Sequence, residues 1–388
     1  MEEDITVTAT ESAVSASAGT AELATPPKRK RHVNQQKLQD NLWGWAFCVP
    51  LLVGTILFVY VALVIAVILS FGNYSTNTGL SVWQYMGDLF SGKGNLIDGD
   101  PFYWYKYAFL ENEMFTGTWG ATHGEYLPWD ETNPENIRIG TPMNALGATL
   151  FNTVFYMIGI PIGMILSMFF AVCMSRDIKG GNVFRVLYYI PCVASTVSII
   201  YTFKLLFATN GLINGMFGTS LPWIPRAGVD AEIGAEGTID TFWTQGIISK
   251  LVIIIMSVWK GLGGTIILYV AGLSGVNAAT KEAAQIDGAS GWTSFWKVTM
   301  PDLYPTIFYN IVTSVIGGMQ IYAEPELLFG TGTSVNLMTA GYVSLIWYHG
   351  INKGNANTSQ GAAYGMILAV IIFVLTLFQF WLDSRNKD

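Results

Sequence analysis

The sequence predicts an all-helical membrane protein with six transmembrane helices, because it is apolar, carries few charges and divides into long apolar stretches. Of its 388 residues, 51% are hydrophobic and only 12% are charged, whereas a soluble domain carries about 25% charged residues. The 13 Trp, 18 Tyr and 22 Phe suit a protein with two membrane interfaces, where amphipathic rings collect. This composition argues against a large soluble enzyme.

Six stretches are long and apolar enough to cross the hydrocarbon layer, which takes about 20 residues in a helix. These predicted spans cover residues 42–71, 146–174, 184–207, 246–273, 303–322 and 362–382. Several contain Gly or Pro, which membrane helices tolerate when neighbouring groups satisfy the freed backbone.

Basic residues orient these spans, since cytoplasmic loops carry the excess of Lys and Arg. With the N-terminus inside, 12 Lys and Arg residues flank the spans on the cytoplasmic side and five on the outer side. Both termini are therefore predicted to be cytoplasmic. Residues 1–36 lack apolar periodicity, which indicates a disordered cytoplasmic tail before a transmembrane domain at 37–388.

Charge and cysteine placement narrow the possible partners. The net charge of −7 argues against nucleic acid, and the basic cluster at 28–31 fits a topology signal better than a phosphate-binding surface. Cys48, Cys173 and Cys192 lie in apolar stretches without paired spacing or a nearby His. Neither a disulfide framework nor a metal site is expected from them.

Two outer loops are long, at residues 73–145 and 208–245. The first is an extracytoplasmic insertion with five aromatic residues between 102 and 107, followed by Trp119 and Trp129. Loops longer than about 15 residues usually have a function, and aromatic enrichment is typical of interface cores. Two interpretations stay open: the loop docks an external protein, or it forms a folded cap on the lipid headgroups.

The cytoplasmic loop at 276–301 has two dissimilar halves. Small and apolar residues recur at helical spacing at 279, 283 and 286, which predicts a short helix that Asn277 can cap. Gly288 and Gly291 allow a sharp turn. Aromatic residues then share one face of a second amphipathic piece, which Pro301 is expected to separate from the fifth span.

The first half of this loop has the properties of a docking surface. A helix faced with alanine lets another backbone approach closely, and Glu282 and Asp287 supply acceptors for basic groups of a partner. The alternative, an amphipathic helix lying on the inner leaflet, accounts for the aromatic half only, and anionic lipids would favour more Lys and Arg.

At this loop the sequence resembles the permease subunits of ABC importers. Glu282-Ala283-Ala284, then Gly288, then Met300-Pro301 looks like their EAA loop, and the flanks 268–273 and 301–305 are similar to those of sugar permeases of the maltose and glycerol-phosphate type. The resemblance covers residues 42–384. By it, the residues that couple to the ATPase are Glu282, Ala283, Ala284, Asp287, Gly288, Ala289 and Pro301.

The resemblance implies a type I ABC permease fold in a bacterial inner or plasma membrane. Its implied partners are a second homologous permease, a dimer of ATP-binding subunits, an extracytoplasmic solute-binding protein and a sugar or oligosaccharide. The chain has no G-x-x-x-x-G-K-[ST] phosphate loop. ATP and Mg²⁺ would therefore be used by the partner subunits, and this chain is expected to bind no cofactor and to be a transport subunit, not an enzyme.

Polar and aromatic residues within spans are the candidates for substrate contact. By similarity to the maltose permease, Trp259 would stack on a sugar ring, and Ser257, Ser314 and Gln320 would form hydrogen bonds with it. Helix packing would explain the same residues. Lys260 lies near mid-span, where an unpaired ammonium costs about 2.5 to 3.5 kcal/mol or more. It is expected either to reach the translocation cavity or to pair with an acid of the second permease.

Two other classes of protein can be weighed on the same residues. A secondary sugar transporter needs intramembrane carboxylates or broken helices to couple an ion, and the six predicted spans hold almost no acid. A membrane scaffold would keep the aromatic outer loops but has no use for the docking segment. Proteins that co-purify with the chain would distinguish these classes from an importer.

Overall fold

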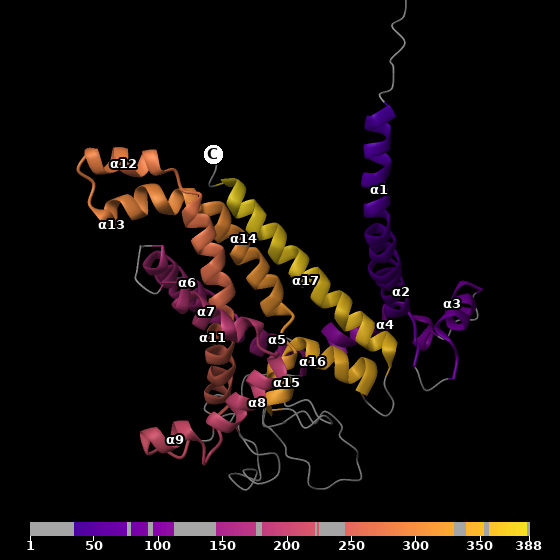
Figure 1. Cartoon of the computed structure of the whole chain (residues 1–388). Coiled ribbons are helices and arrows are strands. Elements are labelled where there is room, and N and C mark those ends of the chain that lie inside the picture. The colour runs from indigo at the N-terminus through magenta and orange to yellow at the C-terminus, as the bar shows by residue number, and fades with distance from the viewer. Residues whose placement is uncertain are drawn as a thin grey trace, which may run out of the picture. The chain divides into compact units, whose positions relative to one another are not determined.

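The computed structural model describes residues 35–75, 79–91, 96–111, 145–175, 181–221, 223–224, 245–329, 339–352 and 357–385. The expected tail therefore lies almost entirely outside the described residues, as do Trp119 and Trp129. The chain divides into two units, residues 1–60 and 61–388, which are described separately (Figure 1).

The first unit consists, in its described part, of α1 (Gln35–Thr55) and the π-helical turn η1 (Ile56–Tyr60). Its described side chains are apolar except for Thr55, and most are exposed, with Phe47 and Phe58 at 80% and 76%. An apolar helix that is exposed on all sides needs lipid or another protein around it. The stretch Trp43–Ser70, with a hydropathy of 3.0 over its most apolar window, is long enough to cross a membrane.

The second unit is also built from helices. Its described helices up to residue 206 are α2 (Val61–Ser70), α3 (Val82–Phe90), η3 (Ile97–Gly99), α4 (Tyr103–Lys106), η4 (Tyr107–Glu111), α5 (Ala145–Tyr156), α6 (Gly159–Met174), α7 (Gly181–Val193) and α8 (Thr196–Leu206). The short helix α9 (Leu212–Phe217) lies within the second predicted outer loop. After that loop come α11 (Gln245–Ser274), α12 (Ala278–Ile286), α13 (Gly291–Ser294), η6 (Phe295–Thr299), α14 (Met300–Met319), α15 (Ala323–Phe329), α16 (Tyr342–Trp347), η7 (Tyr348–Asn352) and α17 (Thr358–Arg385).

The all-helical membrane fold predicted from the sequence is confirmed, whereas the count of six spans stays a prediction. Among the described residues, four segments are long and apolar enough to cross a membrane: 43–70, 146–174, 246–274 and 358–385. The expected third span is the pair α7 and α8, bent by 95°. The expected fifth span is α14, a helix of 20 residues that does not reach the same apolarity.

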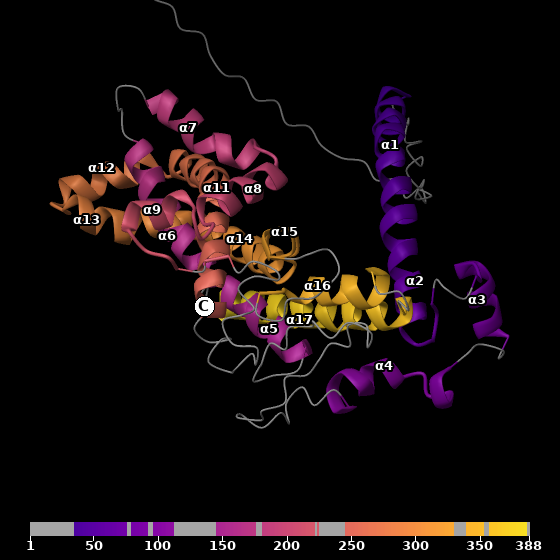
Figure 2. The same ribbon diagram turned by 90° about the horizontal axis from the view of Figure 1, so that it is seen from below.

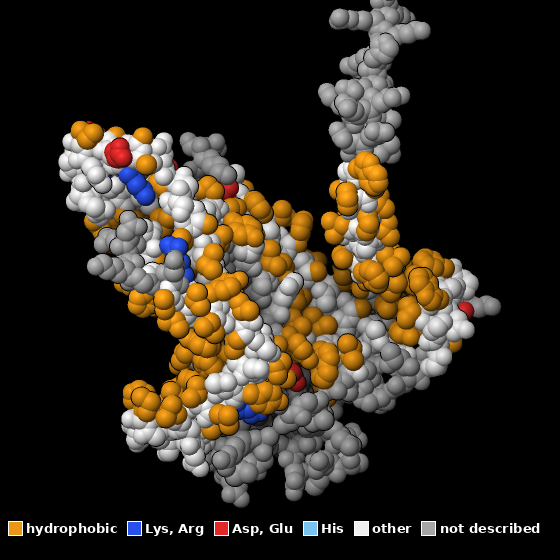
Figure 3. Space-filling model, viewed as in Figure 1, with side chains coloured by type: hydrophobic (Ala, Val, Ile, Leu, Met, Phe, Trp, Pro, Cys, Tyr) orange, Lys and Arg blue, Asp and Glu red, His pale blue; other side chains and the backbone are white. Residues whose placement is uncertain are grey.

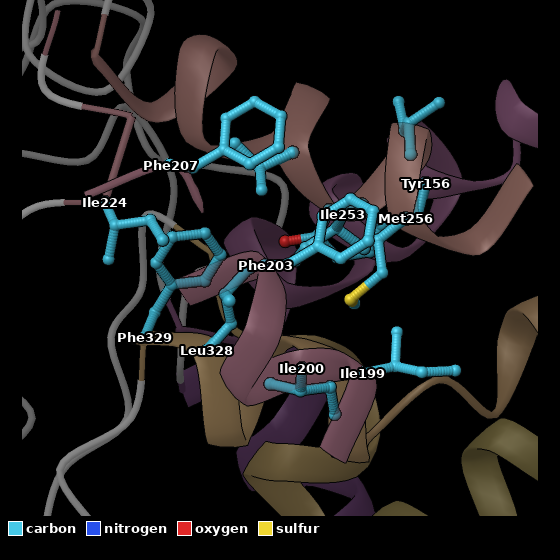
Figure 4. Close-up of a cluster of buried hydrophobic side chains, with 12 residues drawn as sticks. Tyr156, Ile199, Ile200, Phe203, Phe207, Ile224, Ile253, Met256, Leu328 and Phe329 are labelled. Carbon is cyan, nitrogen blue, oxygen red and sulfur yellow. The ribbon is translucent and has the colours of Figure 1, made fainter. Parts of the chain in front are cut away.

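Of four buried clusters in the described part of the second unit, the smallest lies beside α2 and α3 and holds Leu69, Tyr74 and Tyr85. The other three join the remaining long helices. One joins α6, α11 and α14 through Ala171, Ile266 and Leu303. Another joins α5, α16 and α17, and Figure 2 shows α16 lying beside α17. The third, drawn in Figure 4, joins α8, α11 and α15 and includes Phe203 and Leu328. The long helix α11 contributes to two of the three clusters.

Side chains that face away from these clusters are largely apolar. Figure 3 shows hydrophobic side chains over much of one face, with few charged ones among them. On α17, for example, Phe373, Leu377 and Trp381 recur every four residues and are each at least half exposed. A continuous apolar surface of this kind is expected where lipid is the solvent.

Part of the outer loop packs against the end of α2. The Trp104 indole donates a hydrogen bond to the carbonyl of Gly72 at 3.0 Å, and the Tyr105 hydroxyl donates to the Ser70 hydroxyl at 2.8 Å. Phe102 makes an edge contact with Phe71, at 5.4 Å between ring centroids. These aromatic rings therefore contribute to internal packing, as a cap would, while the function of the whole loop stays open.

The close crossing of α7 and α11 yields a stability prediction. A Cβ added at Gly263 would lie 2.2 Å from the carbonyl oxygen of Tyr188, whereas one at Gly261, half a turn away, meets nothing within 4 Å. Gly263→Ala is expected to lower the free energy of unfolding by about 1–3 kcal/mol, as overpacking does. The thermal midpoint in detergent measures this. Gly261→Ala is the matched control, and equal midpoints for both variants would contradict the tight crossing.

Candidate functional site

A pocket of about 500 Å³ lies between α6, α11 and α14, and residues up to Glu324 complete its wall. Five of its lining residues have no side chain to fill the space. They are Gly159, Gly163, Gly261, Gly317 and Gly318. The sequence therefore makes the hollow by placing glycines where three membrane helices face one another.

Polar groups line this pocket although its helices are mostly apolar. They include Ser167, Ser257, Thr265, Asn310, Ser314 and Gln320. The structure thus brings together three of the residues that the sequence analysis assigned to substrate contact, namely Ser257, Ser314 and Gln320. Hydroxyls and amides can donate and accept hydrogen bonds, which suits a ligand with many hydroxyl groups.

Helix geometry separates Trp259 from that set. Successive residues of an α-helix are about 100° apart, so residues 257 and 261 share a face of α11 and residue 259 lies on the other side. Ser257 and Gly261 line the pocket. Trp259 instead packs against Phe203 of α8, at 5.7 Å between ring centroids, and is 44% exposed. The structure does not place its ring in this pocket.

Lys260 has a partner within its own chain. Its Nζ donates to Oε1 of Glu324 at 3.3 Å, and the side chains are 26% and 17% exposed. This partner differs from both expectations for Lys260, the translocation cavity and an acid of the second permease, which followed from the near absence of carboxylates inside the predicted spans. Glu324 lies two residues beyond the fifth of them, in the first turn of α15.

Two further pocket residues were missed. Asn310 is buried on α14, and its amide donates to the Tyr269 hydroxyl of α11 at 3.0 Å. Ser167 is fully buried on α6, and within the described part of the chain its hydroxyl has no hydrogen-bond partner. Buried polar groups are normally hydrogen-bonded, so this hydroxyl is available to a ligand or water. A polar residue in mid-span was the signal in both cases.

The short helix expected in the cytoplasmic loop is present as α12. The side-chain oxygen of Asn277 accepts a hydrogen bond from the amide of Ala279 at 3.0 Å, which makes Asn277 its N-cap as predicted. Gly288 ends the helix with a φ of +79°, a conformation that costs other L-residues about 1–2 kcal/mol. In Figure 1, α12 and α13 lie together at the same end of the unit as the end of α17.

The predicted coupling residues fall into two places. Glu282, Ala283, Ala284, Asp287, Gly288 and Ala289 lie on α12 and its turn, and Pro301 lies in the first turn of α14. No residue of α12 is buried, and Ile286 is 87% exposed. A helix this short has only marginal stability in water on its own. The Asn277 cap and the turn at Gly288 therefore help to hold it and define where it begins and ends.

The expected separation of the aromatic piece from the fifth span is wrong. The segments α13, η6 and α14 follow one another without a break, and Pro301 lies inside this continuous run. Proline is tolerated in the first turn of a helix, and the wider π-helical turn of η6 before it avoids the usual clash with the preceding turn. The aromatic side chains Trp292 and Trp296 contact each other and are exposed.

Comparison with known proteins identifies the family. Residues 145–388, more than half of the chain, match the family described as binding-protein-dependent transport system inner membrane component. The chain belongs to this family, and the resemblance stated from the EAA motif is confirmed. With its long apolar helices, the chain is a multi-pass membrane protein.

Relatives and solved structures agree with this family. A lactose transport system permease protein of Rhizobium radiobacter is 28% identical over 61% of this chain and 76% of its own length. A probable ABC transporter permease protein of Bacillus subtilis is 25% identical over 90% of this chain and 94% of its own. A bacterial ABC transporter involved in the import of the acidic polysaccharide alginate superposes with a TM-score of 0.56 at 17% identity, covering 91% of this chain and 99% of that one. The chain therefore has the fold of an ABC importer permease.

The cap of α12 gives a second prediction. Asn277→Ala removes the acceptor for the Ala279 amide and is expected to cost about 1 kcal/mol of helix stability. Hydrogen exchange at residues 279–281 should become roughly fivefold faster. Asn277→Asp keeps a side-chain acceptor and should exchange like the unsubstituted protein. Unchanged exchange in Asn277→Ala would show that the cap does not hold the helix.

Proposed function

We propose that this chain forms half of the membrane pathway of an ATP-driven importer for a sugar or oligosaccharide. The polar pocket between α6, α11 and α14, in a member of a binding-protein-dependent transport family, is the observation that carries the proposal. A second, homologous permease would form the other half. A solute-binding protein outside the membrane would deliver the substrate, and both termini of the chain would lie in the cytoplasm of a bacterial cell.

The chemistry of the pocket supports a saccharide. Ser257, Ser314 and Gln320 make no side-chain hydrogen bond within the described part of the chain, so their donors and acceptors are available to sugar hydroxyls. The glycine-lined wall leaves flat surface for the faces of sugar rings. One relative, a lactose transport system permease protein, points to the same substrate class.

The exposed helix α12 supports coupling to ATP-binding subunits. Its alanine face is accessible and Glu282 is exposed beside it, so a partner can approach the backbone and form an ion pair at its edge. ATP and Mg²⁺ would be bound by those subunits, which would make this chain a transport component without catalysis of its own. Closure of the ATPase dimer would move α12 and change access to the pocket, a two-state change driven by differential affinity.

Identification of the proteins that co-purify with the chain in mild detergent tests this proposal against the other classes. If the chain is part of an importer, a second permease and an ATPase dimer should co-purify with it. A homodimer without an ATPase would support a secondary transporter, and an unrelated membrane partner would support a scaffold.

The substrate pocket gives a third prediction. Ser314→Ala and Gln320→Ala each remove hydrogen-bonding groups worth about 0.5–1.5 kcal/mol. The sugar concentration that gives half-maximal uptake by the reconstituted transporter should rise by roughly two- to tenfold. Thr313→Ala is the control on the same helix, because that hydroxyl bonds to the carbonyl of Tyr309 at 2.9 Å and does not line the pocket. Equal uptake by all three variants would count against the pocket.

The coupling loop gives a fourth prediction. Gly288→Ala places a side chain at a φ of +79°, and the resulting strain of about 1–2 kcal/mol should lower substrate-stimulated ATP hydrolysis by roughly 5- to 30-fold. Gly291→Ala is the matched control in the same loop, since its Cβ meets nothing within 4 Å and its φ is not positive. Stimulation that is unchanged in Gly288→Ala would remove the loop from the coupling path.

A further inference from the structure

The ion pair between Lys260 and Glu324 presents its two ends differently to the pocket. Glu324 lines the pocket, whereas Lys260 does not. Among the described lining residues, Glu324 is the only carboxylate, and none is a lysine or arginine. The carboxylate of the pair therefore lines the pocket, and the ammonium lies behind it.

The carboxylate has capacity left for a ligand. Lys260 donates to Oε1 of Glu324, and within the described part of the chain Oε2 takes part in no hydrogen bond. A carboxylate has about four lone-pair sites. Hydrogen bonds from hydroxyl groups to an ionised acceptor are about twice as strong as those between neutral groups.

Packing holds Glu324 in this position. It lies in the first turn of α15, whose Leu328 and Phe329 are buried in the cluster with α8 and α11. In Figure 4, Leu328 and Phe329 lie near Phe203 and Ile253. Lys260 follows Met256 of the same cluster by four residues and so lies on the same face of α11. The pair therefore joins α11 and α15, which both contribute to one buried cluster with α8.

We propose that Glu324 makes the pocket selective for uncharged saccharides over saccharides that carry carboxylates, with Lys260 as the residue that positions it. This inference rests on the proposed function. A neutral sugar donates its hydroxyls to the carboxylate. A uronic acid would bring a second negative charge to the same wall, where limited access of water strengthens like-charge repulsion.

The test is a charge swap that keeps the ion pair. In the variant with Lys260→Glu and Glu324→Lys, the ammonium faces the pocket and the carboxylate lies behind it. The probes are maltotriose, which is neutral, and trigalacturonate, which carries three carboxylates. Equilibrium dialysis against the purified transporter complex measures the dissociation constant of each probe.

The unsubstituted complex is expected to bind maltotriose at least tenfold more tightly than trigalacturonate. The swap should shift this ratio by at least tenfold toward trigalacturonate. A swap variant that is folded and whose ratio stays within twofold of the unsubstituted value would overturn the inference, because a structural ion pair alone would leave selectivity unchanged.

Two single variants guard against misfolding of the swap. Glu324→Gln keeps the shape of the side chain and removes the charge. It should lower the preference for maltotriose over trigalacturonate, measured as the ratio of their dissociation constants, at least threefold. Glu326→Gln removes a charge from the same helix at a residue that does not line the pocket, and should leave the ratio unchanged. Equal ratios in these two variants would overturn the inference. If the unsubstituted complex bound neither probe, the proposed function would fail together with it.

Discussion

Close packing around α11 is the interaction on which the rest of the second unit depends. One part of this helix packs against α6 and α14, and another against α8 and α15. Two crossings of α11 depend on small residues: a Cβ at Gly159 of α6 would lie 3.3 Å from Ile254, and one at Gly263 would meet the backbone of α7. Within a bilayer, association of helices relies on such van der Waals contact because lipid tails are as apolar as the side chains.

Small residues also line the pocket. A Cβ at Gly261 of α11 or Gly317 of α14 would meet nothing within 4 Å, so space remains at these two positions instead of a contact. Polar groups can exist there because they face one another and not the lipid, and Asn310 is held by Tyr269 of the adjacent helix. Tight packing on both sides of α11 thus fixes the position of groups that have no partner of their own.

The sequence predicted the helical membrane fold, the capped helix of the cytoplasmic loop and three of the residues that line the pocket. Each depends on local pattern: apolar length, an Asn before a helical repeat, or a polar residue in an apolar run. Trp259 was grouped with Ser257 by the resemblance of their shared segment to a maltose permease, although residues two positions apart on a helix point about 200° away from each other. Glu324 could not be connected with Lys260, because only the folding back of α15 against α8 and α11 brings residues 64 positions apart into contact.

The unbroken passage from η6 into α14 has a mechanical consequence. The same helical run begins at the exposed loop of α12 and α13 and carries Ser314 in the wall of the pocket, with Gln320 directly at its end. A helix of 20 residues is about 30 Å long, so a tilt of about 10° displaces one end by roughly 5 Å relative to the other. Such a rod acts as a lever arm: a displacement at the loop needs no relay of intermediate side chains to reach the wall of the pocket. The π-helical turn before Pro301 is then the place where this helix can bend, so its stiffness decides how much of the displacement reaches the pocket.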